Sequence, residues 1–459
     1  METASQRVGR ILDDLPFQRY HTKILTLIIA GLFFDFFDVS VLGSLAPDLI
    51  ATRFATQSQI AIIASATFAG LLLGSVLQGG LTDRLGRKFI YQMNLAIYGL
   101  ATIASALSPD YRFLAVLRFI AGLGLGAEIP LAYSYAAEFV PRRSRGLALG
   151  LVNLFGGTLA FPVALLVSLL LRDSLGWRGI FALNGVGAMA VFFLRIALPE
   201  SPRWLAARGR GSEALVVLRK MGVANLPDML PPTADDTARV DPFVVVFTRY
   251  TRRVTAIMIA FFCAFLSTYA LVTWLPSLMA GRGFTITKSL TFTLVMISAF
   301  PISSLILMFL LDRIGRIRIA VVSFLLAGIF AVAFSSSHSE ATLLTTGFLM
   351  SFFVISAANA LDILCGEIFP TTARSTGSGL SFGAGRLGAV FGSYAVLEAM
   401  RLYGMDGVFW MIGGILLVGA ISTALLGGDP SRLSLEEAAR PDRPDETLKE
   451  KVVSHRRSN

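Results

Sequence analysis

Long apolar runs alternate with short polar stretches along almost the whole chain. A helix needs roughly 20 mostly apolar residues to cross a bilayer, and twelve runs are close to or above that length. They lie near residues 24–47, 59–81, 89–108, 113–136, 146–171, 179–198, 254–279, 289–311, 317–335, 341–364, 375–399 and 408–427. The pattern therefore predicts an all-α membrane protein with twelve transmembrane helices.

Two motifs recur at one fixed offset. The pattern D-R-x-G-R begins at Asp83 and again at Asp312, and the pattern E-x-x-P-x-x-x-R begins at Glu138 and again at Glu367. Both pairs are separated by 229 residues. Because two unrelated patterns share this offset, we expect two pseudo-symmetric six-helix bundles in parallel.

The repeat and the apolar runs together predict five segments. They are a cytoplasmic N-terminal segment at 1–23, an N-terminal six-helix bundle at 24–198, a cytoplasmic central loop at 199–253, a C-terminal six-helix bundle at 254–427 and a cytoplasmic polar tail at 428–459.

Composition and charge agree with this reading. Hydrophobic residues make up 54% of the chain and charged residues only 15%, whereas soluble proteins carry about 25% charged residues. The predicted side with both termini holds 30 of the 40 Lys and Arg residues and the other side holds 7. Positive loops mark the cytoplasmic side, so the net charge of +10 reflects topology rather than a nucleic-acid partner. Both cysteines lie in expected helices, so no disulfide is expected.

Three motifs resemble the major facilitator superfamily over nearly the whole chain. The run from Gly79 to Lys88 resembles its signature loop between helices 2 and 3. The run from Pro199 to Leu205, PESPRWL, resembles an element of the sugar-porter and metabolite–proton symporter branches, as does the R-x-x-x-G-x-G pattern that begins at Arg118. The resemblance implies a secondary transporter of the bacterial inner membrane that works by alternating access.

Other positions depart from sugar porters. The seventh run lacks their Gln-Gln pair and instead contains Trp274-Leu275-Pro276, which looks like the aromatic-acid and niacin-type symporters. The first run contains Asp35-Phe36-Phe37-Asp38, whereas the aromatic-acid branch usually has D-G-x-D.

Charged residues without a counterpart at the 229-residue offset are candidates for solute and proton handling. They are Asp35, Asp38, Arg118, Glu128 and Arg386. A charge near the bilayer midplane costs at least about 2.5–3.5 kcal/mol, so each is expected to have a function and a partner.

Asp35 and Asp38 lie three residues apart and share one helix face. Two close carboxylates in a low dielectric do not both ionise readily, so one of them is a candidate proton site with Arg118 as counter-ion. The alternative is a static ion pair. Glu128 either binds a proton or cationic group, or pairs with Arg118.

Arg386 is the main candidate for solute binding, because a guanidinium can hold a carboxylate by two parallel hydrogen bonds. The alternative is an ion pair with Asp362. Other candidates for lining a solute cavity, each also compatible with ordinary helix packing, are Tyr133, Asn153, Tyr269, Trp274, Asn359 and Asp362.

The repeated motifs supply a candidate gate. By resemblance they latch the cytoplasmic side, and the alternative is a charged turn that fixes topology. We also expect Glu138 to pair with Arg145, and Glu367 with Arg374. The gating set is Asp83, Arg84, Arg87, Glu138, Arg145, Asp312, Arg313, Arg316, Glu367 and Arg374.

These observations favour proton-coupled symport of a small organic solute, in particular a carboxylate and including aromatic ones. The alternatives are transport of a sugar or other neutral metabolite, efflux, or a solute sensor. No Walker motif, nucleophile–base pair or metal-ligand cluster is present in the sequence. We therefore expect no enzyme activity and no cofactor, a proton gradient as driving force, and a monomer in the lipid bilayer.

Overall fold

A computed structural model describes residues 4–126, 128–223, 226, 246–248, 250–369 and 374–426. Inside its helices it leaves out the side chains of residues 4–6, 79, 80, 82–84, 312, 366, 367, 374 and 375. All structural statements below concern the residues and side chains that remain.

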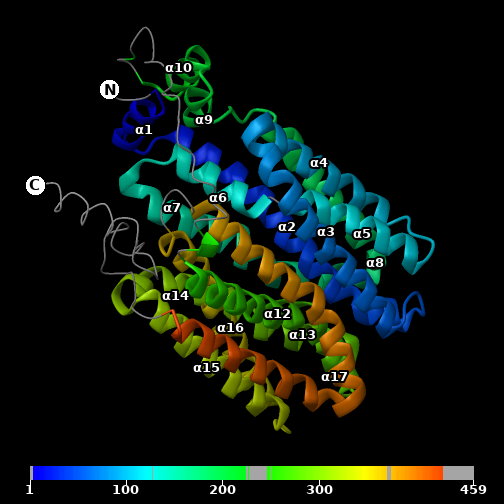
Figure 1. The fold of residues 1–459 in the computed structure, drawn as a ribbon. Helices are drawn as coiled ribbons and strands as arrows, with labels where there is room; N and C mark the ends of the chain where they lie inside the picture. The colour runs from blue at the N-terminus through cyan, green and yellow to red at the C-terminus, as the bar shows by residue number, and fades with distance from the viewer. Residues whose placement is uncertain are drawn as a thin grey trace, which may run out of the picture.

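The described helices form two groups, which Figure 1 shows as an upper, mainly blue and cyan ribbon and a lower, green to red ribbon. The N-terminal group consists of α2 (Arg19–Ala51), α3 (Gln57–Leu85), α4 (Arg87–Ser105), α5 (Tyr111–Leu125), α6 (Glu128–Phe139), α7 (Arg145–Leu151) and α8 (Ala160–Arg195). The C-terminal group consists of α12 (Thr251–Gly281), α13 (Ile286–Ile297), α14 (Ala299–Ile314), α15 (Arg316–Ser335), α16 (Glu340–Glu367) and α17 (Arg374–Ala424).

The helix α8 reverses direction at Gly176, where φ is 61°. Before this turn, Ser168 meets Ser44 of α2 at 2.6 Å, and beyond it Asn184 donates to Asp38 of α2 at 2.7 Å. The chain therefore travels along α2 and then returns. A positive φ suits glycine because it has no Cβ.

The helix α17 reverses in the same way at Gly404, where φ is 69°. Gly388 before the turn lies against the backbone of Phe262 of α12, and Ser422 beyond it donates to the carbonyl of Ala256 at 2.6 Å. Both parts of α17 thus pack along α12.

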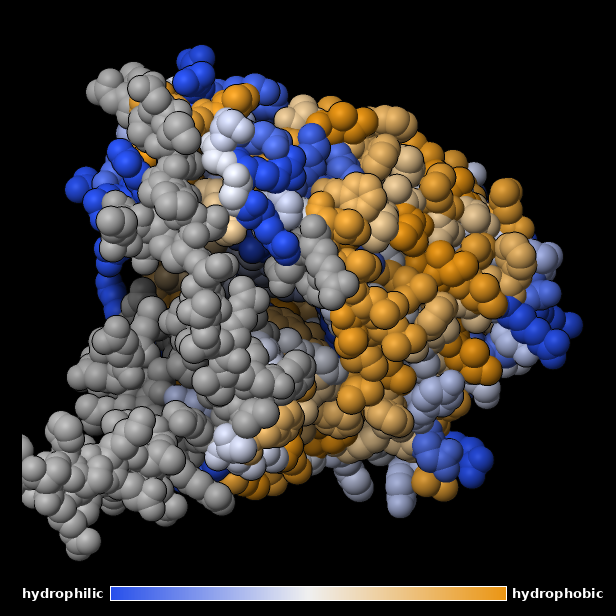
Figure 2. Space-filling view, turned by 45° about the horizontal axis from the view of Figure 1, so that its top comes forward, coloured by the Kyte–Doolittle hydropathy of each residue, from blue (hydrophilic) through white to orange (hydrophobic). Residues whose placement is uncertain are grey.

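Nine helices in the described chain are long and apolar enough to cross a membrane. Two of the nine contain the reversals at Gly176 and Gly404, and α4 runs back between the ends of α3 and α5. This arrangement agrees with the twelve crossings expected from the sequence. Figure 2 shows a broad orange band of apolar residues with blue residues gathered at its ends, as a bilayer requires.

The two ends of the helices differ. We call the end where α2 begins the terminal face and the end where α2 finishes the distal face. The helices α1 (Ala4–Asp14), α9 (Pro202–Ala207) and α10 (Gly211–Lys220) lie together at the terminal face (Figure 1). On the distal side, Asp110 caps α5 by accepting from the backbone N–H groups of Arg112 and Phe113 at 2.8 and 2.9 Å.

The helix α1 was not predicted from the sequence, which suggested only a polar segment at 1–23. Val8 and Leu12 are fully buried in one apolar cluster with Leu205 of α9 and Leu218 of α10. Their spacing of four residues places both on one face of a helix, and this is the signal that could have revealed it.

The two groups are in direct backbone contact in the half of the molecule nearer the distal face. A Cβ added at Gly43 of α2 would lie 2.2 Å from the carbonyl oxygen of Val272 of α12. Nearby, the hydroxyl of Ser65 on α3 donates to the carbonyl of Val390 on α17 at 3.0 Å. Backbone contact at Gly43 therefore closes this seam between the groups.

Gly43→Ala is expected to loosen the seam, because the new methyl group would collide with the backbone of α12. A cysteine substituted for Ser65 should then react faster with a small water-soluble thiol reagent. The native Cys263 and Cys365 are buried and should add little background. Gly414→Ala, at a position with no neighbour within 4 Å, is the matched control. Equal labelling rates in the two variants would contradict the role of Gly43.

Candidate functional site

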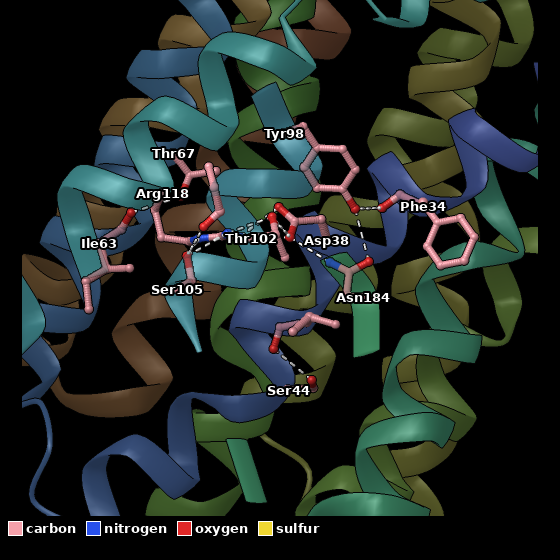
Figure 3. Close-up of polar contacts among 12 residues, drawn as sticks. Phe34, Asp38, Ser44, Ile63, Thr67, Tyr98, Thr102, Ser105, Arg118 and Asn184 are labelled. Carbon is pink, nitrogen blue, oxygen red and sulfur yellow. Dashed lines mark hydrogen bonds and ion pairs between the residues drawn. The ribbon is translucent and has the colours of Figure 1, made fainter. Parts of the chain in front are cut away.

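A buried ion pair joins Asp38 of α2 to Arg118 of α5 (Figure 3). The Nη1 group of Arg118 donates to both carboxylate oxygens of Asp38 at 2.8 and 2.9 Å, and Asn184 adds a third bond at 2.7 Å. Thr102 and Ser105 of α4 accept from Nη2 of Arg118 at 2.8 and 3.0 Å. Both charges are therefore well supplied with partners.

A second buried ion pair was missed by the sequence analysis. Arg195 of α8 donates to Glu128 of α6 at 2.6 Å, to the hydroxyl of Tyr91 at 2.9 Å and to the carbonyl of Leu27 at 2.9 Å. Gly31 leaves the space for this guanidinium, since a Cβ there would lie 1.7 Å from it.

The alternative pairing of Glu128 with Arg118 was wrong, because each has another partner. The 229-residue offset could have identified Arg195, because it places the uncharged Ala424 at the corresponding position.

Asp35 contrasts with Asp38, although one turn of α2 separates them. Both carboxylate oxygens of Asp35 are buried, and neither has a hydrogen-bond partner among the described residues. Glu128, Arg195 and Arg386 lie within electrostatic range of it. The first helix therefore carries one carboxylate that is fully paired and one that is not.

Polar side chains from both groups meet between them, on the terminal side of the closed seam. Asn153 of the N-terminal group donates to Asn359 of α16 at 3.4 Å, and Asn359 donates to Ser304 of α14 at 2.9 Å. Tyr133 of α6 lies beside Asn153 and within electrostatic range of Asp362. Asn153 belongs to a π-helical turn, Val152–Thr158, which the sequence did not predict and which is frequent at functional sites.

Arg386 of α17 is buried at the same interface and donates to the backbone carbonyl of Leu71 in the other group. The alternative pairing with Asp362 is not found among the described contacts. Tyr269 of α12 lies within electrostatic range of both residues, and its ring packs against Phe68 with centroids 4.7 Å apart. Trp274 lies five residues further along α12 and is fully buried in the apolar core.

Ion pairs at the terminal face join α1, α4, α6, α7 and α9. Arg87 pairs with Glu138 at 2.8 Å, and the backbone N–H groups of Arg87 and Lys88 donate to Glu200 at 3.2 and 3.1 Å. Asp13 of α1 pairs with Arg145 at 2.5 Å and with Arg203 at 2.7 Å. The expected tie between Glu138 and Arg145 was therefore wrong, because each residue has a different partner.

The remaining gating candidates are only partly described. Arg313 is exposed and Arg316 is half-buried. Five candidates lie outside the described side chains: Asp83, Arg84, Asp312, Glu367 and Arg374.

The family model described as "Sugar (and other) transporter" matches residues 23–440. The chain belongs to this family. It is a transporter of the major facilitator superfamily and not an enzyme, and its apolar helices are those of a multi-pass membrane protein.

Three curated relatives are similar over nearly their whole length. The chain is 31% identical to the niacin transporter NiaP of Acinetobacter baylyi over 435 residues, covering 94% of this chain and 98% of that protein. It is 28% identical to the 4-hydroxybenzoate transporter PcaK of the same organism, covering 90% and 92%. It is 29% identical to a gallate transporter of Pseudomonas putida, covering 92% and 95%.

A solved structure has the same fold. The xylose transporter XylE of E. coli, in a partially occluded inward-open conformation, superposes with a TM-score of 0.73 at 18% identity, covering 88% of this chain and 97% of that one. This similarity confirms the major facilitator fold predicted from the sequence.

Asp38→Ala is expected to destabilise the transporter far more than Asp35→Ala. Removing Asp38 leaves Arg118 buried without its carboxylate, and breaking a buried pair costs about 3–5 kcal/mol. Thermal unfolding of both variants in detergent is the measurement, with the unsubstituted protein as reference. A loss of stability in Asp35→Ala as large as that in Asp38→Ala would contradict the difference between the two carboxylates.

Proposed function

We propose that this transporter carries small organic carboxylates, aromatic ones included, in symport with protons. The observation that carries the proposal is Arg386, a guanidinium buried between the two groups whose described hydrogen bond goes to a backbone carbonyl. Its remaining N–H groups are able to hold a carboxylate by two parallel hydrogen bonds. An arginine at membrane depth is costly, and no ion pair of Arg386 is among the described contacts, so an anionic solute would stabilise it.

The surroundings of Arg386 suit a ring as well as a charge. Tyr269 lies next to the guanidinium, and Tyr133 lines the same interface from the other group. Aromatic faces such as these can stack against a planar solute. Niacin, 4-hydroxybenzoate and gallate, which the three relatives carry by name, each join a carboxylate to an aromatic ring.

Asp35 is the proposed proton site in the N-terminal group. Asp38 accepts hydrogen bonds from Arg118 and Asn184 that tie three helices together, so its role is structural. Asp35 has no such donors and lies near Glu128. A buried carboxylate without a partner binds a proton more readily, and reversible protonation is what coupling needs.

In the proposed mechanism, alternating access depends on the contact between Arg386 and Leu71, which joins the two groups. A solute carboxylate that takes up the guanidinium competes with this contact and so favours a different arrangement of the groups. We place both termini in the cytoplasm, on the basis of the excess of Lys and Arg on that side. The terminal face is then cytoplasmic, and its ion pairs around Arg87 and Asp13 serve as part of the gate.

A sugar or another neutral metabolite is the second candidate. Asn153, Asn359 and Ser304 form a chain of uncharged hydrogen-bonding groups across the interface, which would suit hydroxyl groups. Arg386 has no obvious use with such a solute, so the carboxylate is preferred.

Arg386→Ala is expected to lower carboxylate uptake at least tenfold relative to the unsubstituted protein. Proteoliposomes with an imposed pH gradient and labelled nicotinate, 4-hydroxybenzoate and xylose provide the measurement. Arg401→Ala, on the exposed side of the same helix, is the matched control and should transport normally. Uptake of xylose alone, or carboxylate uptake that is unaffected in Arg386→Ala, would remove the anion proposal and leave the transporter fold.

Asp35→Asn is expected to separate coupling from binding. The variant should still exchange labelled for unlabelled carboxylate across the membrane, but a pH difference should drive much less accumulation of solute than in the unsubstituted protein. The amide keeps the size of the side chain and cannot carry the proton. Accumulation by Asp35→Asn at the unsubstituted level would exclude Asp35 as the coupling residue.

A further inference from the structure

The interior charges divide into paired and unpaired ones. Arg118 pairs with Asp38 at 2.8 Å and Arg195 with Glu128 at 2.6 Å, both inside the N-terminal group. After these pairs are formed, Arg386 is left with a carbonyl contact. Two carboxylates have buried oxygens without a hydrogen bond among the described residues: Asp35, which lies within electrostatic range of Arg195 and Arg386, and Asp362 in the C-terminal group.

Asp362 faces the space between the groups. It lies three residues after Asn359 on α16, so the two side chains share one helix face, and Asn359 contacts Asn153 of the opposite group. One carboxylate oxygen of Asp362 is buried without a hydrogen-bond partner, while the residue as a whole is partly exposed. Its surroundings are therefore neither a salt bridge nor bulk water.

The titratable groups around Asp362 are few in the described structure. Tyr133 faces it from α6, Tyr269 from α12, and Cys365 from its own helix. Arg386 reaches the same tyrosine, Tyr269, from α17. A negative charge bound at Arg386 would therefore share Tyr269 as a neighbour with Asp362, while Asp35 also lies within electrostatic range of Arg386.

We propose that Asp362 is a second proton-carrying residue, protonated when a solute carboxylate binds at Arg386. This inference rests on the proposed function. Two anions close together in a low dielectric repel each other, so a bound carboxylate favours the protonated form of Asp362. By thermodynamic reciprocity the protonated form binds the carboxylate more tightly. Solute and proton would thus be coupled within one half of the transporter.

A second proton would change the net charge that crosses the membrane in each transport cycle. One proton on Asp35 and one on Asp362 would accompany one carboxylate, and both protons would be released with the solute on the other side. Two protons and one monovalent anion carry one net positive charge. With Asp35 alone, the cycle would be electrically neutral.

The deciding variant is Asp362→Asn, measured in proteoliposomes with nicotinate and 4-hydroxybenzoate. Uptake by the unsubstituted protein should increase when valinomycin and a potassium gradient make the interior negative, and one net charge should move per anion. In Asp362→Asn this voltage dependence should vanish while pH-driven uptake remains. Glu340→Gln, a surface acid at the distal end of the same helix, is the matched control and should keep the voltage dependence.

Infrared difference spectra of the purified protein give a readout that needs no transport. The band of a protonated carboxyl group should be present and pH-sensitive, and Asp362→Asn should remove a part of it that Glu340→Gln leaves in place. If Asp362 stays ionised over the whole pH range in which the protein is folded, the inference is overturned even when carboxylates are transported. Voltage dependence that persists in Asp362→Asn would overturn it as well.

A different role for Asp362 would produce a different result. If it binds a cationic group of the solute, Asp362→Asn should lose uptake of N-methylnicotinate, which carries both charges, and keep uptake of 4-hydroxybenzoate with its voltage dependence. That outcome would also overturn the inference. Failure of every carboxylate to be transported, with the infrared band intact, would instead count against the proposed function alone.

Discussion

A guanidinium buried in a bilayer protein must find carboxylates or carbonyls, and this requirement organises the N-terminal group. Arg118 gathers partners from α2 and α4, and Arg195 gathers partners from α2, α4 and α6. Each arginine thereby ties several helices around one charge. Breaking either set would leave a charge without a partner at membrane depth, which costs about 3–5 kcal/mol, as much as one severe substitution in a packed core. We therefore expect the helices of the N-terminal group to move together, as one unit, relative to the C-terminal group.

The C-terminal group is held together differently. Its described interior combines an apolar core with close backbone approaches, such as Gly388 against the carbonyl of Phe262, and hydroxyl pairs, such as Ser303 with Ser356 at 2.6 Å. Its interior guanidinium, Arg386, does not bind within its own group but reaches a carbonyl of the other one. The guanidinium that could bind a solute therefore also helps to hold the two groups together. Binding of a solute carboxylate to Arg386 would compete with its contact to the carbonyl of Leu71.

The sequence predicted the fold well because it depends on patterns that run along the chain. Apolar runs of sufficient length give the helices, and the offset that relates Asp83 to Asp312 gives the two groups. The individual partners were harder to predict. Glu128 and Arg195 lie 67 residues apart, and their contact depends on the depth and rotation of two helices, which spacing does not fix. The π-helical turn Val152–Thr158 was likewise not predicted from the sequence.

The two helix groups are related by the sequence repeat, but the charges in their interiors are not. This asymmetry matters for the coupling of solute and proton. Asp35 belongs to the N-terminal group, whereas Arg386 and Asp362 belong to the C-terminal one. Residues inside one group keep their distances when the groups rock, but residues on opposite groups do not. A solute held at Arg386 therefore changes its distance from Asp35 during the cycle, and the electrostatic energy between them changes with it. Rigid motion of two halves is then sufficient to alter proton affinity, without any rearrangement of the ion pairs within either half.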